Sequence, residues 1–510
     1  MIKGLLRAID DEGMDRVHEA ALRVLEQTGL LIRGDFLLRA LADAGCRVDF
    51  AKQRAWFRAD LVERQISAQR GRYGMVRSSL WYPFCAQMPR DDAALPADFT
   101  VDYGFTTPSI YDYPEGTYRV PTARDQVEMI HLGDALGPVK AVCAPFICGD
   151  VDPRMESMET ARMLLLNTDK PGWVSTASAR EVPFLAELAA LALDVRGKAG
   201  GRKGPEGFPA AEKADLLSRM PPMFAHAYCT TSPLKLDTHA CNVLREALRY
   251  RFPVNFAPMP ILGGTTPMTP AGSMVVATAE ILGCMTAVSL IDPELFFYAT
   301  VISGETDMKT TQVCYSTPAA ILTDAALHQL FRFRYGIVLN VEPAYVEAKC
   351  PGIQAAFMKT YRQMAFAGMV SAPHPIGLLD NGSAFSPTQA MIDLDANRAM
   401  FKLGQGFPVN DDTLCVDLIN RLEFCESEVY LQSDHTLAHF RDVMWDTRVF
   451  DRTYRRGGSY RPADADARVL EEADREWRRI VAGHAPPARD KHFRAEVDGI
   501  VDAARKEFMA

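Results

Sequence analysis

The chain has 510 residues, of which 48% are hydrophobic, and a formal net charge of −9 at pH 7. This composition can bury a large core, and its interspersed charges exclude the basic stripe of a nucleic-acid-binding protein. No run of about 18 apolar residues that would cross a membrane appears, and the charged first segment lacks the apolar core of a signal peptide. We therefore expect a cytoplasmic protein without nucleic-acid or membrane partners.

Residues 1–95 are predicted to form a helical segment that packs on a larger domain. Its clearest element is DRVHEAALRVLEQTG, in which apolar residues recur at helical spacing until Gly29 ends the helix.

Residues 96–424 repeat a strand, a polar loop and an amphipathic helix. Thr269, Thr317 and Ser386 each precede a proline, as N-cap residues do, and Gly336 and Gly404 are expected to end two of the helices. This rhythm predicts a TIM (β/α)8 barrel with added N-terminal and C-terminal helices, and its chemistry is expected in the loops that follow the strands. The predicted strands are Val139–Ile147, Trp173–Ala177, Val254–Leu262, Glu294–Ile302, Ile337–Glu342 and Gly368–Pro373.

One connection in this region has an unusual composition. The stretch Arg196–Asp215 is rich in Gly, Lys and Pro. It is either a plain surface loop or a lid, and the plain loop is the commoner case.

Residues 425–510 are predicted to form a C-terminal helical extension. His435 and His439 lie four residues apart on one helix face, which would suit a metal, but no third ligand is evident nearby. The eleven cysteines occur without a CxxC pair, which indicates reduced thiols. No directly bound metal is expected.

Several segments resemble the trimethylamine methyltransferase family in their amino-acid sequence, their order and their spacing. They include HEAALRVLEQTG, YDYPEGTYRVPTARD, NTDKP, SPL, GGTTPMTPAG, TDM, EAKCPGIQAAFMK and DHTLAHFR. The resemblance implies a TIM barrel that moves a methyl group from a methylated amine to the Co(I) corrinoid of a separate protein, which docks over the barrel mouth. We also expect a homo-oligomer.

The resemblance is closest to the branch of the family that lacks pyrrolysine. Only standard residues stand in VEPAYVEAKCPG, where the trimethylamine enzymes carry pyrrolysine. This branch includes enzymes that demethylate quaternary amines such as glycine betaine. The alternatives are a sulfonium or tertiary amine as methyl donor, or a non-catalytic onium-binding barrel.

A quaternary ammonium leaves as a neutral tertiary amine when its methyl group is attacked, so the enzyme need not protonate it. The site must hold a cation away from water, and each aromatic face contributes about 0.5–2 kcal/mol to this. Ordinary packing is the alternative for every aromatic candidate. The candidates are Tyr103, Phe105, Tyr111, Phe146, Trp173, Tyr298 and Tyr345.

The carboxylate of a betaine would need a hydrogen-bond donor. His374 directly follows the strand GMVSAP and is the first candidate, and His226 with Tyr228 is the second. Asp307 is positioned to face the onium charge, whereas Glu305 is better explained as a loop brace.

The remaining candidates are assigned to the corrinoid. Gly263, Gly264 and Thr265 would let the backbone approach a ligand, with a tight turn as the alternative. Lys349 and Gln354 match the family motif residue by residue, and they are predicted to orient the substrate or the partner.

Overall fold

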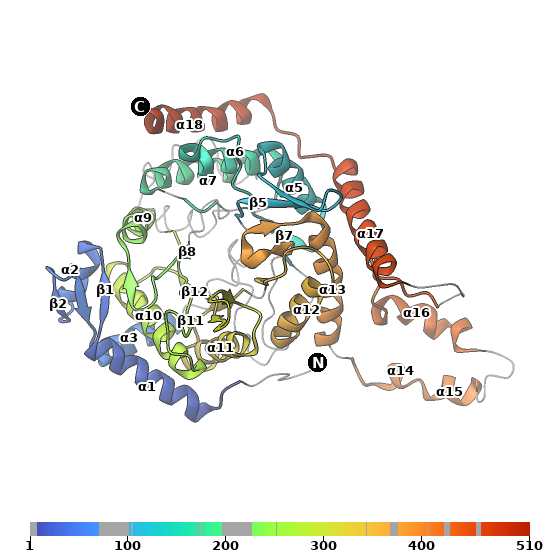
Figure 1. Cartoon of the computed structure of the whole chain (residues 1–510), viewed down its shortest axis with the longest axis horizontal. Coiled ribbons are helices and arrows are strands. Elements are labelled where there is room, and N and C mark those ends of the chain that lie inside the picture. The colour runs from blue at the N-terminus through green and yellow to red at the C-terminus, as the bar shows by residue number, and fades with distance from the viewer. Residues whose placement is uncertain are drawn as a thin grey trace.

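Helices surround a central set of short strands in the computed structural model of the chain (Figure 1). Each of α9, α10, α11 and α12 follows one strand of the central set along the chain. The residues that the structure describes are 8–70, 101–103, 106–170, 172, 174–176, 178–195, 227–250, 252–342, 344–367, 376–405, 407–422, 429–454 and 461–510.

Four central strands are parallel and lie side by side in chain order, namely β8 (Ala227–Tyr228), β10 (Val254–Phe256), β12 (Phe297–Val301) and β15 (Leu339–Val341). A second parallel pair joins β4 (Val101–Tyr103) to β7 (Val139–Val142), and Tyr103 bridges in parallel to Ile376. The described structure is therefore an α/β fold with parallel sheets. The helices between these strands are α5 (Ala123–Ala135), α6 (Glu156–Asn167), α7 (Val182–Val195), α9 (Thr238–Arg249), α10 (Pro270–Ile291), α11 (Pro318–Gln329) and α12 (Ile353–Ala367).

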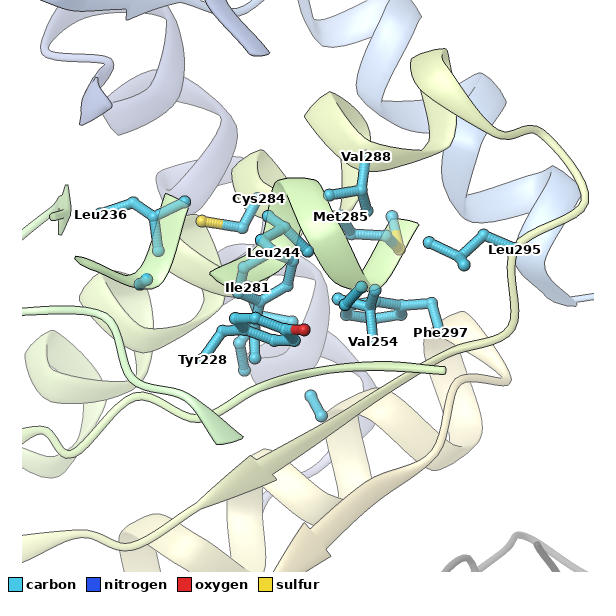
Figure 2. Close-up of a cluster of buried hydrophobic side chains, with 14 of the residues drawn as sticks. Tyr228, Leu236, Leu244, Val254, Ile281, Cys284, Met285, Val288, Leu295 and Phe297 are labelled. Atoms are coloured by element: carbon cyan, nitrogen blue, oxygen red, sulfur yellow. The ribbon is translucent and has the colours of Figure 1, made fainter. Parts of the chain in front are cut away.

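Helix α10 lies at the centre of the largest apolar cluster. Figure 2 shows Val254 of β10 and Phe297 of β12 gathered with Ile281 and Met285 of this helix. By length and composition α10 could cross a membrane, but 78% of its most apolar window is buried inside the protein. Its apolar character is thus explained by its place in the core.

The predicted helix caps occur at three places. Thr269 and Thr317 accept hydrogen bonds from the third residue that follows each of them, and Ser386 does the same ahead of α13 (Pro387–Gln405). Gly336 ends its helix in the left-handed conformation, with φ of 63°. Helix α13 ends at Gln405, one residue after the predicted end at Gly404.

The N-terminal part is not purely helical, in contrast to the prediction. A sheet lies beside its three helices and contains an antiparallel pair between residues 47–49 and 54–56. Its apolar side chains join the same cluster as those of α10. Its elements are α1 (Asp11–Gln27), β1 (Leu30–Ile32), α2 (Asp35–Asp43), β2 (Arg47–Asp49), β3 (Arg54–Trp56) and α3 (Ala59–Arg70), with β9 (Lys235–Leu236) completing the sheet.

Two small sheets form in the loops that follow the parallel strands. The predicted strand 254–262 is divided because Pro258 and Pro260 lack the N–H groups that a sheet needs. The first small sheet contains β11 (Ile261–Leu262), β13 (Gly304–Thr306) and β14 (Val313–Cys314). The second contains β16 (Leu378–Leu379), β17 (Ala384–Phe385), β5 (Ser109–Asp112) and β6 (Thr117–Arg119).

The C-terminal region contains two kinds of helix. Helix α17 (Pro462–Gly483) packs on α13 and α5, and α18 (Lys491–Met509) packs on α6 and α7. Helices α14 (Asp411–Leu414), α15 (Val416–Leu422) and α16 (Asp434–Val443) instead project away from the ring of helices (Figure 1). The predicted strand at 368–373 and the stretch 196–215 lie outside the described residues, as does part of the predicted strand 173–177.

Candidate functional site

The central strands β10, β12 and β15 have two different faces. Alternate residues of these strands pack outward against helices in the large apolar cluster. Because side chains alternate along a strand, the residues between them point to the inner side of the ring. In the strand register Asn255 is opposite Tyr298, and Thr300 is opposite Asn340. All four side chains are buried, so the inner side is polar and aromatic.

The polar inner face continues into the loops at the carboxyl ends of the strands. Glu342 directly follows β15 and is partly buried. Tyr345 follows three residues later, and its ring lies 5.4 Å from the ring of Tyr315 between centroids. Met259 and Ile302 pack in the same small cluster as Tyr345. Two tyrosines, two apolar side chains and one carboxylate therefore gather at the ends of three neighbouring strands.

Burial changes the acidity of this carboxylate. The loss of solvent raises the pKa of Glu342 to about 7, and the attraction of the nearby Arg362 opposes that rise. Burial also raises the pKa of the Tyr345 hydroxyl. The site therefore holds one carboxyl group that titrates near neutral pH and a phenol that stays protonated.

Arg362 of α12 connects the elements that carry the site. Its fully buried guanidinium is paired with Asp324 of α11 at 3.0 Å, and it donates to the backbone carbonyl oxygens of Glu342 and Tyr315. Asp324 also accepts the backbone N–H of Ser303, at 2.8 Å. One ion pair thus holds the ends of β12 and β15 and the loop of Tyr315 together.

The two tyrosines are held from the loop side as well. The carboxylate of Glu347 accepts the backbone N–H groups of Tyr315 and Ser316. Gly382 has φ of +80°, and a Cβ atom at this position would lie 2.6 Å from the Tyr345 ring. The ring of Tyr345 therefore occupies space that only a glycine leaves open.

The predicted aromatic candidates fall into three groups. Tyr298 and Tyr345 belong to the site described above. Tyr111 lies farther out on β5, where its ring packs edge-on against Tyr118 at 5.3 Å. Tyr103 and Phe146 are buried in a different apolar cluster against Phe385, which corresponds to the packing alternative.

Four other candidates cannot be placed. Phe105, Trp173, His226 and His374 lie outside the described residues, and their roles stay predictions. Tyr228, which was paired with His226, is fully buried in the large apolar cluster.

The polar candidates lie on the outer loops rather than among the inner side chains. Asp307 accepts the backbone N–H of Lys309 and the hydroxyl of Thr310, and these hydrogen bonds lower its pKa. Lys349 is exposed and pairs with Asp380, and Gln354 is exposed at the start of α12. Asp307 thus braces its own loop.

The glycine pair forms a tight turn. Gly263 has φ of +77°, and the hydroxyl of Thr265 accepts the backbone N–H of Ile261 at 3.0 Å. The backbone N–H of Gly264 is donated to the carbonyl of Ile261 at 3.0 Å. The hydrogen bonds of the turn are thus made within the turn itself, which agrees with the alternative of a plain tight turn. Both glycines are exposed.

Sequence reasoning missed several residues of the site. Asn255, Asn340 and Glu342 each interrupt or end an apolar strand, and this isolated polarity was the available signal. Arg362 and Asp324 lie on helices and gave no comparable signal.

Comparison with known proteins identifies the family. Residues 3–509 match the trimethylamine methyltransferase (MTTB) family. Trimethylamine methyltransferase MttB of Desulfitobacterium hafniense is 28% identical over 99% of this chain and 95% of its own length. A glycine betaine methyltransferase from another strain of that species is 20% identical over 98% of this chain and 97% of its own length. The crystal structure of the Methanosarcina barkeri monomethylamine methyltransferase (MtmB) superposes with a TM-score of 0.45 at 11% identity, covering 98% of this chain and 87% of that one.

The family match extends over nearly the whole chain, and the relative with 28% identity does so as well. The chain is therefore a methyltransferase of the trimethylamine methyltransferase family, in agreement with the resemblance seen in its sequence.

Proposed function

We propose that the enzyme transfers a methyl group from a quaternary amine, such as glycine betaine, to the Co(I) corrinoid of a separate protein. In this reaction Co(I) supplies the electron pair of the new cobalt–carbon bond. The electron pair of the broken C–N bond stays on nitrogen, which leaves as a neutral tertiary amine. No proton is transferred, so the enzyme has to bind the cation, orient one methyl group and exclude water.

The observation that carries the proposal is the grouping of Tyr315 and Tyr345 with Glu342 at the carboxyl ends of adjacent strands, while Tyr298 lies lower on the same inner face of β12. Aromatic faces and a carboxylate are the groups that attract a quaternary ammonium. The charge of Arg362 is compensated by Asp324, so it does not oppose a bound cation. Asn255, Asn340 and Thr300 offer hydrogen bonds to the rest of the substrate.

Two further observations support a quaternary amine. The sequence contains only standard residues and therefore no pyrrolysine. One relative that aligns over almost the full length is a glycine betaine methyltransferase. A tertiary amine would leave as an amide anion unless it were activated, and the groups described above supply no such activation.

We further propose that the parallel strands close into a (β/α)8 barrel. The row β8–β10–β12–β15 and the pair β4–β7 would be two arcs of it. The parallel bridge between Tyr103 and Ile376 supports closure on one side. The remaining two strands would be those predicted from the sequence at 173–177 and 368–373, which lie partly or wholly outside the described residues.

The barrel mouth is the proposed approach for the corrinoid protein. Gly263, Gly264 and Lys349 are exposed in the loops after β10 and β15, and Gln354 is exposed at the start of α12, where the loop after β15 ends. A partner that presents cobalt to the substrate would contact these loops. The cytoplasmic location predicted from the sequence belongs to the same proposal.

A direct assay would test the reaction. The purified enzyme is mixed with cob(I)alamin, or with a co-purified corrinoid protein, and a panel of methylated donors, and the cobalt spectrum is followed. Methylated cobalt from betaines but not from trimethylamine is the expected result. Transfer only from sulfonium donors or only from trimethylamine would overturn the assignment of the donor.

Two substitutions test the binding site within that assay. Tyr345→Leu removes one aromatic face and should raise the KM for the quaternary amine by roughly tenfold. Tyr103→Phe is the matched control, because this tyrosine is buried in the other apolar cluster. His374→Ala should weaken a betaine more than choline, which has no carboxylate, and equal effects on the two ligands would remove His374 from the carboxylate role.

A further inference from the structure

The part of the C-terminal region that projects from the ring has no apolar core of its own. We call this segment the arm, meaning the described residues 407–422 and 429–446 with helices α14, α15 and α16 (Figure 1). Helices α14 and α16 have no buried residue, and in α15 only Leu422 is buried. None of the described arm residues belongs to either of the two large apolar clusters.

The arm leaves helix α13 and returns to it. It begins after Gln405, at the end of α13, and Lys402 of that helix donates to the backbone carbonyl of Asp442 at 2.9 Å. The chain is fixed again where Asp395 accepts the hydroxyl of Thr447 and the backbone N–H of Arg448, both at 2.7 Å. The arm is therefore anchored at both ends, and its position is determined by the ring.

The arm carries its large apolar side chains on the outside. Leu431 is 82% exposed, Phe407 79% and Val443 76%. Between the helices lies a cavity of about 550 Å³ whose lining includes the four aspartates Asp411, Asp412, Asp417 and Asp434. All four aspartates are exposed as well, so the arm exposes both its charged and its large apolar side chains. Exposed apolar side chains gathered on one segment are typical of a surface that another molecule covers.

Helix α12 has an exposed face of the same apolar kind. Ile353 is 71% exposed, Phe357 67% and Met364 50%, and the ring of Tyr361 stacks on that of Phe357. The two charged residues of α12, Lys359 and Arg362, are both buried on its inner side. About three turns of a surface helix thus expose no charged side chain.

We propose that the arm of one chain covers the outer face of α12 in a second copy of the chain, and that the two copies exchange arms reciprocally. The two apolar surfaces lie on neighbouring elements, because α12 packs on α13, from which the arm extends. A two-fold axis beside α13 would therefore bring each arm onto the partner's α12, and such an isologous contact leaves neither surface exposed.

The size and charge of the surfaces favour this occupant. The exposed apolar side chains of the arm and of α12 together offer on the order of 1,000 Å², which is the scale of about 800 Å² per partner that a stable interface needs. Six aspartates and two arginines give the described arm a formal net charge of −4. That charge opposes adsorption to an anionic membrane, which is the other common destination of an apolar surface segment.

The first test is the mass of the full-length protein in solution, measured by sedimentation velocity at micromolar concentration. A dimer is expected. Phe357→Glu on α12 and Leu437→Glu on the arm should each raise the dimer dissociation constant at least about 30-fold. Phe50→Glu is the matched control, since this aromatic is also exposed but lies in the turn between β2 and β3, and it should leave the dimer unchanged.

The second test identifies which surfaces meet. Two chains with different tags are co-expressed, one with Phe357→Cys and the other with Leu437→Cys, and treated with a short bismaleimide. Cross-links between the two tags, absent when either variant is expressed alone, are expected. A monomer at all concentrations, a dimer that survives Phe357→Glu, cross-links only between arms, or binding of the wild type to anionic vesicles in place of self-association would each overturn the proposal.

Discussion

The inner ends of the strands and the arm differ in which side chains are placed against their usual preference. Charged side chains are buried in the first region, and apolar side chains are exposed in the second. Beside the loops at the carboxyl ends of the strands, which we call the mouth, the two cations of α12 are buried, and each is paired with a carboxylate of another helix, as in Arg362–Asp324 and Lys359–Asp393. In the arm, apolar side chains such as Leu431 and Val443 are exposed, and none of the described residues covers them. The buried cations of α12 are therefore satisfied within one copy of the protein, whereas the proposed exchange would cover the arm only in an assembly.

Removal of a buried charge at the mouth should have the largest effect. Arg362→Met leaves Asp324 buried beside Glu342 without its counter-ion, so the free energy of unfolding should fall by about 3–5 kcal/mol. Urea unfolding followed by circular dichroism measures this change. Arg154→Met breaks a pair between exposed groups and should change stability very little. Equal losses of unfolding free energy in the two variants would contradict the greater importance of the buried ion pair.

A backbone change beside Tyr345 should have the next largest effect. Gly382→Ala places a side chain in the left-handed region and against the Tyr345 ring, which should cost about 1–2 kcal/mol of stability. It should also weaken binding of a quaternary amine, measured by calorimetry. Gly499→Ala in α18 meets no atom within 4 Å and should stabilise the protein by about 0.5–1 kcal/mol.

The pH dependence of ligand binding should reveal the carboxyl group at the mouth. Because burial raises the pKa of Glu342 to about 7, the group is charged above that pH and neutral below it. Only the charged form attracts an onium ion, so the affinity should be about tenfold weaker at pH 6 than at pH 8. Glu342→Gln should remove this dependence. Glu128→Gln, on the surface of α5, should retain it, and a flat profile in the wild type would exclude Glu342.

The smallest effect is expected in the arm. Leu431→Ser replaces a side chain that is 82% exposed, so the stability of the dilute monomer should change by less than about 0.5 kcal/mol. Thermal unfolding at nanomolar concentration measures this. At micromolar concentration the same change should lower the midpoint, because the dimer loses contact area. A large loss in the monomer would mean that the arm packs within its own chain.

The alternation of strands and helices could be predicted from the sequence because it depends on local signals. The hydroxyl caps at Thr269 and Thr317 and the apolar runs of β10, β12 and β15 are local, and the structure has them where they were predicted. The break within the first of these strands was missed, although its prolines were visible.

The candidate site was predicted only in part, because much of it depends on contacts between distant residues. Tyr345 was identified from its place after a predicted strand, and Tyr298 from its place within one. Tyr315 and Arg362 are brought to the site by a loop and a helix, and nothing in their own neighbourhoods in the sequence indicates this. Asp307 carries the same kind of local signal as Glu342, yet it only braces a loop.

Helix α12 has a further consequence for how this protein tolerates change. Its inner side fixes the loops of the mouth through Arg362, and its outer side presents the face that includes Phe357. A helix occupied on both sides has few positions left where substitutions are neutral. Random mutagenesis should therefore find α12 far less permissive than α18, whose outer side faces solvent, and a tag or label is better attached to α18.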